Sequence, residues 1–450
     1  MSSLGPGRSF LLWLSLFLLF IGNGRLVGGG DVVPAILLPV ALLRGDGPVL
    51  DRFADALRDP DGRIPGFATE SRGHVVSRYP LGAPIVALPF TLPQLALLDL
   101  ADPSWEADGL RALASCRRMA KNASAAVAGL GAVLMAMLLT RMGLAREAVP
   151  AAVVVALGSD HWAVASQAPW QHGSAALCLA GALVLLRRPD GIPGVTGSPS
   201  RLAMAGASTA MMVVCRPIDA VFAVALSLWA LANLDRRGRW AFHLPAVTIA
   251  AAWLSYNVWF FDTPYGGYAD LEETHPWAHG TEGTWTGSIG PGLAGTLFSP
   301  SHGLLVYSPW IALAIALLPA SVRHGRLPRT SPERWLLWAL VPNLLMLAKY
   351  SCWWGGHCFG PRFWIDAGPI FAVALGLGLE RALRSSRALL AAFALTAAWS
   401  ITLQTVGFLS YPTSWFRSPT NADRDHARLW HWRDTEVSRG LAEGIKPRDW

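Results

Sequence analysis

Long runs of apolar residues, almost free of charge, recur along the whole chain and are separated by short polar segments. A helix needs about 20 such residues to cross a membrane, and each run supplies most or all of that length. The clearest runs are 11–22, 123–140, 151–165, 220–233, 304–319, 335–347, 370–379 and 389–408. The pattern predicts an all-α protein, a polytopic transmembrane bundle of about 11–13 spans.

Arginine is concentrated in short segments between these runs, and two runs fit between each successive pair of segments. By the positive-inside rule, arginine-rich segments face the cytoplasm. They are 141–146, 187–201, 236–239, 323–334 and 381–387. The segments between them hold most of the polar and aromatic residues and are therefore predicted to lie outside: 167–172, 216–217, 262–303, 351–365 and the tail after 410.

The run from Leu81 to Leu100 is the least regular, because Pro84, Pro89 and Pro93 interrupt it. An N-terminus inside and a tail outside require an odd number of spans, whereas the runs suggest about twelve. We therefore expect this segment to be re-entrant or to pair differently with a helix over 111–121. Prolines also occur in true spans, so both readings stay open.

The composition agrees with a membrane protein: 52% of the 450 residues are apolar and 15% are charged. The net charge of +7 comes from short loops between spans, which argues against a nucleic-acid-binding protein. No charged linker or repeat marks a second domain, so residues 1–450 are predicted to form one membrane domain. Its external elaborations are 31–80, 262–303 and 410–450.

Two of these elaborations have features of their own. The first opens with "DVVPAILLPVALL", whose apolar spacing fits an amphipathic helix in the membrane interface, and continues as a turn-rich loop. The tail mixes charges with tryptophans, which fits either a surface helix at the lipid interface or a lid over an external site.

The five cysteines contain no CxxC pair, so neither a zinc ribbon nor a thioredoxin-type centre is predicted. Cys352 and Cys358 lie in one external segment, where they form either a disulfide or two small buried side chains.

Asp31 and Arg362 are the two residues best suited to chemistry. Asp31 directly follows the first apolar run, where its carboxylate could act as a general base or cap the next helix. Arg362, in "FGPRF", offers a rigid fork for a phosphate. Its alternative role is a salt bridge with Asp366 or with a carboxylate of the tail.

Further polar and aromatic residues lie near the outer ends of the predicted spans. Because polar groups at such depth are costly unless paired, we expect them to converge on one wet cavity, although each alone could be structural. Two tryptophans could stack on a sugar ring or belong to the interfacial aromatic belt. The polar and aromatic residues near the outer ends of the spans are Arg78, Tyr79, His172, Arg216, Tyr256, Asn257, Trp353, Trp354 and His357.

No P-loop, HExxH, GxSxG or strand-associated GxGxxG motif is present. Glu272, Glu273, His275 and His279 are close enough in sequence to bind a metal, but such clusters are more often solvated loops. No cofactor is therefore predicted; a divalent cation stays open, without a motif that indicates one.

Several quoted segments together resemble a known family. They are "GDVVPA", "SRYPLGAPIVALPF", "PWQHG", "SYNVWFFDTPYGGY", "GLAGTLFSPSHGLLVYSPW" and "CWWGGHCFGPRFWIDAGP". The set is similar to bacterial membrane proteins of the GT-C glycosyltransferase superfamily, the relatives of protein mannosyltransferases, aminoarabinose transferases and oligosaccharide transferases. The likeness runs over nearly the whole chain, and "SPSxGLLVYSP" and "WWGGxxFGPR" are its most specific parts.

The resemblance implies a GT-C-like bundle with an odd number of helices, an external active site and a polyprenyl-phosphate sugar as donor. It also implies a catalytic carboxylate just after the first span, where Asp31 stands. Relatives often carry Asp-Glu there, whereas this chain has Asp31-Val32. Either a second acid comes from elsewhere, with Asp46, Asp51 and Glu70 as candidates, or base catalysis is weak.

The resulting expectation is a glycosyltransferase of the bacterial inner membrane. It would transfer a sugar to a lipid, glycan or protein acceptor on the external face by an inverting displacement, in contact with membrane lipids and without nucleic acid. Two other classes stay open: a transporter or flippase, which should show discontinuous spans related by an internal repeat, and a non-catalytic scaffold.

Overall fold

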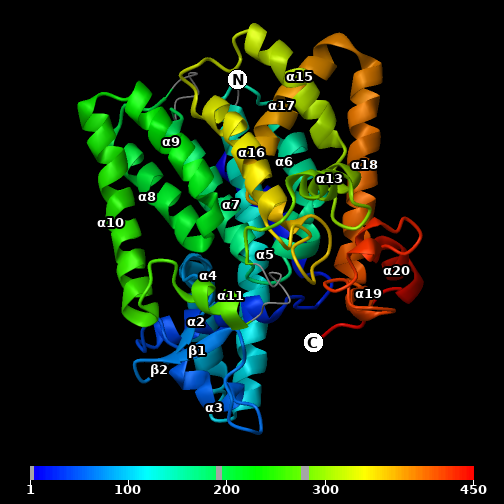
Figure 1. The fold of residues 1–450 in the computed structure, drawn as a ribbon. Helices are drawn as coiled ribbons and strands as arrows, with labels where there is room; N and C mark the ends of the chain where they lie inside the picture. The colour runs from blue at the N-terminus through cyan, green and yellow to red at the C-terminus, as the bar shows by residue number, and fades with distance from the viewer. Residues whose placement is uncertain (1–4, 189–194, 275–282, 450) are drawn as a thin grey trace.

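The computed structural model describes residues 5–188, 195–274 and 283–449, and these residues are mostly helical, with two short strands. The all-α prediction is confirmed. Figure 1 shows the helices. They are α1 (Pro6–Ile21), α2 (Val33–Leu43), α3 (Ala54–Leu57), α4 (Gly82–Ala101), α5 (Gly109–Arg141), α6 (Ala148–Leu157), α7 (Gln171–Leu186), α8 (Pro199–Cys215), α9 (Ala220–Asn233), α10 (Arg236–Phe261), α11 (Gly267–Thr274), α13 (Ile289–Phe298), α14 (Leu304–Tyr307), α15 (Trp310–Arg323), α16 (Pro332–Lys349), α17 (Gly368–Ser385), α18 (Arg387–Leu409), α19 (Thr413–Arg417) and α20 (Glu436–Glu443).

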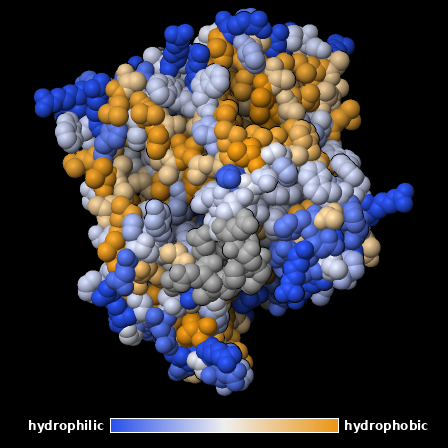
Figure 2. All heavy atoms as spheres, in the orientation of Figure 1, coloured by the Kyte–Doolittle hydropathy of each residue, from blue (hydrophilic) through white to orange (hydrophobic). Residues whose placement is uncertain are grey.

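Four helices of the described chain are long and apolar enough to cross a membrane: α4, α5, α10 and α18. Shorter apolar helices accompany them, including α1, α6, α7, α13 and α15. Side chains such as Leu244, Val247 and Val258 leave one face of α10 apolar and exposed. Figure 2 shows such residues as an orange zone across the middle of the molecule, with hydrophilic residues gathered toward both ends. This distribution is that of a multi-pass membrane protein.

The bundle has two different ends (Figure 1). The arginine end holds the N-terminus and the α9–α10, α15–α16 and α17–α18 connections, which contain the arginine-rich segments. The loop end holds α2, α3, α11, α19, α20 and an antiparallel hairpin of β1 (Ala68–Ser71) and β2 (His74–Ser77). The predicted outer segments thus come together at one end of the bundle.

Helices α8 and α10 pack closely at a glycine. On α8, Gly206 lets α10 approach so closely that an added Cβ would lie only 1.8 Å from the carbonyl oxygen of Phe242. Such contacts let helix backbones approach and increase van der Waals packing, which drives helix association in lipid. Helix α17 is buried on every side from Gly368 to Leu379 and forms the centre of the largest apolar core.

The structure corrects one local expectation and resolves an open one. Residues Pro34 to Ala41 of α2 are all buried, so this helix is not an amphipathic helix in the interface. A helix that is apolar on every side belongs inside the protein, and α2 packs against α4 and α5. The segment after Leu81, for which two readings were open, is one continuous helix, α4, that contains Pro89 and Pro93 and is long and apolar enough to cross a membrane. The hairpin of β1 and β2 follows the turn-rich loop and had not been predicted.

Candidate active site

Asp31 and Arg362 form an ion pair at the loop end of the bundle. Asp31 lies in a 3-10 turn (Gly30–Val32) that leads into α2, and no side chain caps the start of that helix. Nη1 of Arg362 instead donates a hydrogen bond to Oδ2 of Asp31 over 3.1 Å. Asp31 is thus not a helix cap, and Arg362 pairs with neither Asp366 nor a tail carboxylate, as one alternative had expected.

Aromatic rings hold the guanidinium of Arg362 in place. Its Cζ lies 4.6 Å from the ring centroid of Trp170 and 5.6 Å from that of Phe363. Such cation–π contacts orient the planar group and leave its N–H edges free to bind an anion. The side chain is 15% exposed and that of Asp31 is 23% exposed, so both groups are partly accessible.

Two tyrosines lie beside the ion pair. The ring of Tyr79, from the segment between β2 and α4, meets the ring of Tyr268 of α11 edge to face at 6.1 Å. Burial raises the pKa of Tyr79, and the charge of Asp31 raises it further. Burial also raises the pKa of Tyr268 to about 12, and its hydroxyl donates to Oε1 of Gln171 over 2.9 Å. Both phenols therefore stay protonated near neutral pH and act as hydrogen-bond donors.

His172 and Arg216 form a second group, centred on Asp366. Arg216 and Asp366 form a buried ion pair, and Nδ1 of His172 lies 3.2 Å from Oδ2 of Asp366. The ring of Phe363 lies 5.1 Å from Cζ of Arg216 and 5.8 Å from the ring of His172, and it also contacts Arg362. The ring of Phe363 is thus shared by the second group and by the Arg362 side of the ion pair.

Trp353, Trp354 and His357 face the tail rather than Asp31. Asp423 of the tail contacts both Trp354 and His357. Its Oδ1 accepts a hydrogen bond from Nε1 of Trp354 over 2.8 Å, and its Oδ2 lies 2.8 Å from Nε2 of His357. Trp353 packs against Trp430 of the tail and fills the space beside Gly295 of α13. In this structure these three residues attach the tail to the loop that carries Arg362.

The remaining predicted residues, Arg78, Tyr256 and Asn257, contact the backbone of loops or of the start of α11. Nδ2 of Asn257 donates to the carbonyl of Pro264 over 2.8 Å, and Nη1 of Arg78 donates to that of Gly66 over 3.1 Å. The backbone of Arg78 also packs so closely on Gly267 that no Cβ fits there. The hydroxyl of Tyr256 lies 3.5 Å from the carbonyl of Pro48. Their described contacts are therefore structural.

The three candidates for a second acid are all engaged elsewhere. Asp46 pairs with Arg52, Asp51 with His74 and Glu70 with Arg58. None of these contacts involves Asp31. In the part of the chain that the structure describes, no group of three His, Cys, Asp or Glu residues could hold a metal ion. His275 and His279, and the side chains of Glu272 and Glu273, lie outside the described residues.

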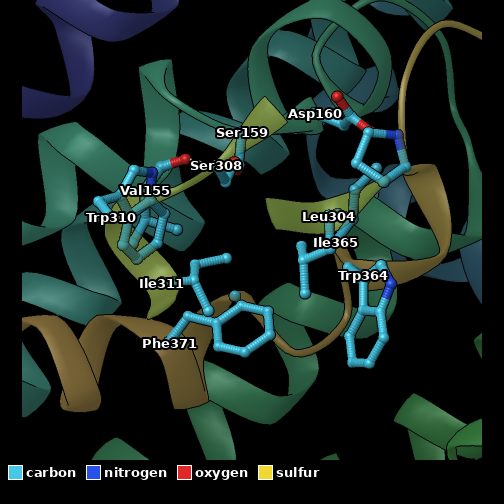
Figure 3. Close-up of a pocket in the computed structure, with 12 residues that line it drawn as sticks. Val155, Ser159, Asp160, Leu304, Ser308, Trp310, Ile311, Trp364, Ile365 and Phe371 are labelled. Carbon is cyan, nitrogen blue, oxygen red and sulfur yellow. Dashed lines mark hydrogen bonds between the residues drawn. The ribbon is translucent and has the colours of Figure 1, made fainter. Parts of the chain in front are cut away.

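All five cysteines are unpaired and buried, so Cys352 and Cys358 are the small buried side chains of the second alternative. A pocket opens behind the loop of Arg362, and Figure 3 shows that its walls are mainly apolar. Pro361 is among its lining residues, Asp160 lies at its edge, and Trp310, Ile311 and Phe371 form much of its wall. Because it offers few polar groups, this pocket is a space within the core rather than a second reactive site.

Sequence reasoning missed three residues that shape the site. Trp170 lies in the segment "PWQHG", from which His172 was predicted. Tyr268 ends the segment "SYNVWFFDTPYGGY", from which Tyr256 and Asn257 were predicted. Glu436 in the tail had no local signal, although its Oε2 accepts hydrogen bonds from the Gly360 N–H over 2.9 Å and the Tyr307 hydroxyl over 3.1 Å.

The arrangement of helices is similar to that of a known transferase. The chain matches the structure of the Archaeoglobus fulgidus oligosaccharyltransferase, solved with a tethered acceptor peptide containing an NVT sequon, at a TM-score of 0.53 and 13% identity. The chain has a GT-C fold. The match covers 95% of this chain and 59% of the transferase, so the chain spans about three-fifths of that protein's length. No family model and no curated protein matches the chain.

At this identity the GT-C likeness concerns the fold. It confirms the predicted GT-C-like helical fold and identifies neither a family nor a subgroup. The catalytic assignment therefore depends on the residues at the loop end, above all on the pair of Asp31 with Arg362.

Proposed function

We propose that the protein is a GT-C glycosyltransferase that moves a sugar from a polyprenyl-phosphate carrier to a hydroxyl or amide of a lipid, glycan or protein acceptor. The loop end would face the outside of a bacterial inner membrane, as the arginines at the opposite end suggest. Residues 1–450 would act as one membrane domain, with 31–80, 262–303 and 410–450 outside. The observation that carries this proposal is the ion pair of Asp31 and Arg362 in a GT-C fold.

The pair supplies the two groups that a displacement of phosphate requires, a cation that binds the phosphate (Arg362) and a general base (Asp31). The donor phosphate binds the N–H edge of Arg362 and replaces the carboxylate of Asp31 as the anion that pairs with the guanidinium. The released carboxylate of Asp31 accepts the proton of the acceptor nucleophile, which attacks the anomeric carbon from the side opposite the phosphate. The carbon–oxygen bond to the phosphate breaks, and the polyprenyl phosphate leaves with the electron pair.

The surrounding groups fit this step. Tyr79 presents a protonated hydroxyl close to Asp31 and Arg362, where it can donate a hydrogen bond to a phosphate oxygen, whereas Tyr268 donates its proton to Gln171 and packs against the ring of Tyr79. The ring of Trp170 holds the guanidinium in one orientation while negative charge develops on the departing phosphate. The known acceptor of the similar transferase is a peptide, which makes a protein acceptor one of the classes to assay first.

The test is sugar transfer by the purified protein in lipid nanodiscs, with a panel of radiolabelled undecaprenyl-phosphate sugars and lipid, glycan and peptide acceptors. We expect one donor to give a product with the wild type and none with Asp31→Asn at equal protein amounts. Asp46→Asn is the matched control, because Asp46 is an acid of the same loop that pairs with Arg52. Absence of product from every donor would reject the glycosyltransferase.

A further inference from the structure

The loop that carries Arg362 is bonded to the C-terminal tail through two successive peptide groups. The N–H of Phe359 donates to the hydroxyl of Tyr411 over 3.2 Å, and the N–H of Gly360 donates to Oε2 of Glu436 over 2.9 Å. Both partners belong to the tail, and Gly360 lies two residues before Arg362. The tail thus supplies acceptors that the loop does not provide for itself.

The next peptide group, which begins with the carbonyl of Gly360, is bonded as well. The carbonyl of Gly360 lies 2.9 Å from Nδ1 of His302, which must carry the proton of this hydrogen bond. His302 and Tyr307 both come from "SPSHGLLVY", so the tail, this segment and the loop of Arg362 meet at one place. Gly360 itself has φ = +63°, a left-handed conformation, and an added Cβ would lie 2.7 Å from Oδ1 of Asp160. The backbone before Arg362 therefore has little room to move.

Glu436 is a costly residue to bury at this position. Its side chain is 0% exposed, and burial raises the pKa of Glu436 and lowers that of His302 to about 4. Oε1 of Glu436 has no hydrogen-bond partner among the described residues and lies 3.6 Å from Nε2 of His302. A carboxyl group without a cationic partner destabilises a folded protein unless its hydrogen bonds offset the burial, so a role in the site explains its presence better than stability does.

The start of α20 places Glu436 firmly. Thr435 caps this helix: its Oγ1 accepts from the Ser438 N–H over 3.1 Å, and the Ser438 hydroxyl accepts from the Thr435 N–H over 2.9 Å. Glu436 is the first residue after this cap and points into the protein, whereas Glu443 at the other end of α20 bonds to Ser414 and Lys446 near the surface. The acid that contacts Gly360 is thus held by local helix geometry.

We propose that Glu436 is a positioning residue that fixes Arg362 for the donor phosphate by holding the Gly360 peptide. This inference rests on the proposed glycosyltransferase activity and adds a residue from the tail to it. Only the acceptor atom of Glu436 is needed, not its charge. The tail is therefore neither a mere surface helix nor a removable lid, but a support of the phosphate-binding loop.

The test compares Glu436→Ala and Glu436→Gln for transfer in nanodiscs, with Glu443→Ala as the control from the same helix. We expect Glu436→Ala to lower kcat by about tenfold or more, because small misplacements of a binding group are costly. Glu436→Gln keeps an acceptor oxygen and should stay within about threefold of the wild type. An unchanged kcat in Glu436→Ala, or an equal loss in Glu436→Gln, would overturn the proposal.

A double-mutant cycle separates positioning from general destabilisation. If Glu436 acts through Arg362, adding Glu436→Ala to Arg362→Ala should cost less than about twofold more, whereas independent effects would multiply. A multiplied loss would also overturn the proposal. If the Glu436→Ala protein does not accumulate, Gly360→Ala displaces the same peptide while leaving the tail residues unchanged, and wild-type kcat in that variant would contradict the inference.

The two hypotheses fail in different ways. Failure of the wild type to transfer any sugar would reject the proposed function. Transfer by the wild type together with full activity of Glu436→Ala would reject the positioning role alone.

Discussion

Asp31 and Arg362 are 331 positions apart in the chain, yet their side chains form a hydrogen-bonded ion pair of 3.1 Å. The pair joins the segment after the first helix to the loop before α17. In the proposed mechanism, binding of the donor phosphate separates the two groups, so the base is released only when the donor is in place. This order would limit deprotonation of other hydroxyls while no sugar is available.

Replacement of Arg362 by lysine should inactivate the enzyme nearly as strongly as replacement by alanine. Lysine keeps the charge but has no planar fork and cannot lie flat on Trp170. We expect kcat/KM for the donor to fall by about a hundredfold, as for other lost groups that stabilise transition-state charge. The measurement is steady-state transfer at varied donor concentration.

Arg72→Lys is the control for this prediction. Arg72 also lies over a tryptophan, with its Cζ 4.8 Å from the ring of Trp259, but at the surface of the hairpin. Its replacement should leave transfer within about twofold of the wild type. Normal activity of Arg362→Lys would show that a point charge suffices and would remove the bidentate phosphate contact from the mechanism.

The hydroxyl of Tyr79 should contribute to donor binding. Removing one hydrogen bond to a charged group costs about 1.5–3 kcal/mol, so Tyr79→Phe should weaken kcat/KM by roughly tenfold or more. Tyr256→Phe is the matched control, because its hydroxyl lies near the carbonyl of Pro48 instead. Equal kinetics of the two variants would place the phosphate away from Tyr79.

The attachment of the tail should weaken in acid. Burial alone would raise the pKa of Asp423, but hydrogen bonds with His357 and Trp354 lower it below its ordinary value of 3.8. A carboxylate with a lowered pKa stabilises the folded form above its ordinary pKa, and that stability is lost as the pH falls through the lowered value. Release of the tail is therefore expected below about pH 4.

Pepsin digestion between pH 4.5 and pH 2 can follow this release as cleavage within residues 410–449. At neutral pH, where trypsin is used instead, Asp423→Ala should expose the tail to cleavage, whereas Asp425→Ala should not. Asp425 is the control because its side chain bonds only to the nearby Thr420 in the described structure. A tail that resists trypsin in Asp423→Ala would contradict the predicted attachment.

The pair of Arg187 and Glu333 at the arginine end should matter for stability and not for chemistry. The two side chains are only 7% and 1% exposed, and Nε of Arg187 donates to Glu333 over 2.8 Å. Glu333→Ala leaves a buried cation unpaired, which typically costs about 3–5 kcal/mol. Thermal unfolding in detergent should show this loss, while kcat per folded molecule stays unchanged.

Arg384→Ala is the control for this stability effect. Arg384 also pairs with a glutamate, Glu380, but its side chain is 76% exposed. Exposed pairs contribute at most about 1 kcal/mol, so this variant should unfold close to the wild type. A similar loss in both variants would mean that burial does not decide the strength of these pairs.

Hydropathy and arginine placement predicted the helical class and the gathering of the polar segments at one end, because lipid and charge act on composition along the chain. Composition did not predict which helices are buried, because that depends on how the helices pack. The segment at Val33 has an apolar pattern that suits an interface, yet α2 is buried on every side. Likewise, the prolines left a re-entrant segment and a true span both open, and α4 continues through Pro89 and Pro93.

The site shows the same limit. Asp31 and Arg362 were chosen from local motifs, but their pairing joins segments that no local pattern connects, and the expected partner Asp366 instead binds Arg216. The tryptophans at 353 and 354 fit a sugar-stacking pattern, yet they pack on the tail. Whether they contact substrate in the course of the reaction stays a prediction. A tail residue such as Glu436 carries no signal until the fold brings it to Gly360.

The bond between Gly360 and Glu436, which spans 76 positions, has a consequence for biosynthesis. A ribosome adds Glu436 well after the loop of Arg362 has been made, and α17 and α18 must be inserted between the two. Until then the phosphate-binding loop lacks its support. In the proposed mechanism, a nascent chain that already holds both Asp31 and Arg362 in the membrane would therefore transfer sugar more slowly than the finished protein, and most of the activity would come only with the tail.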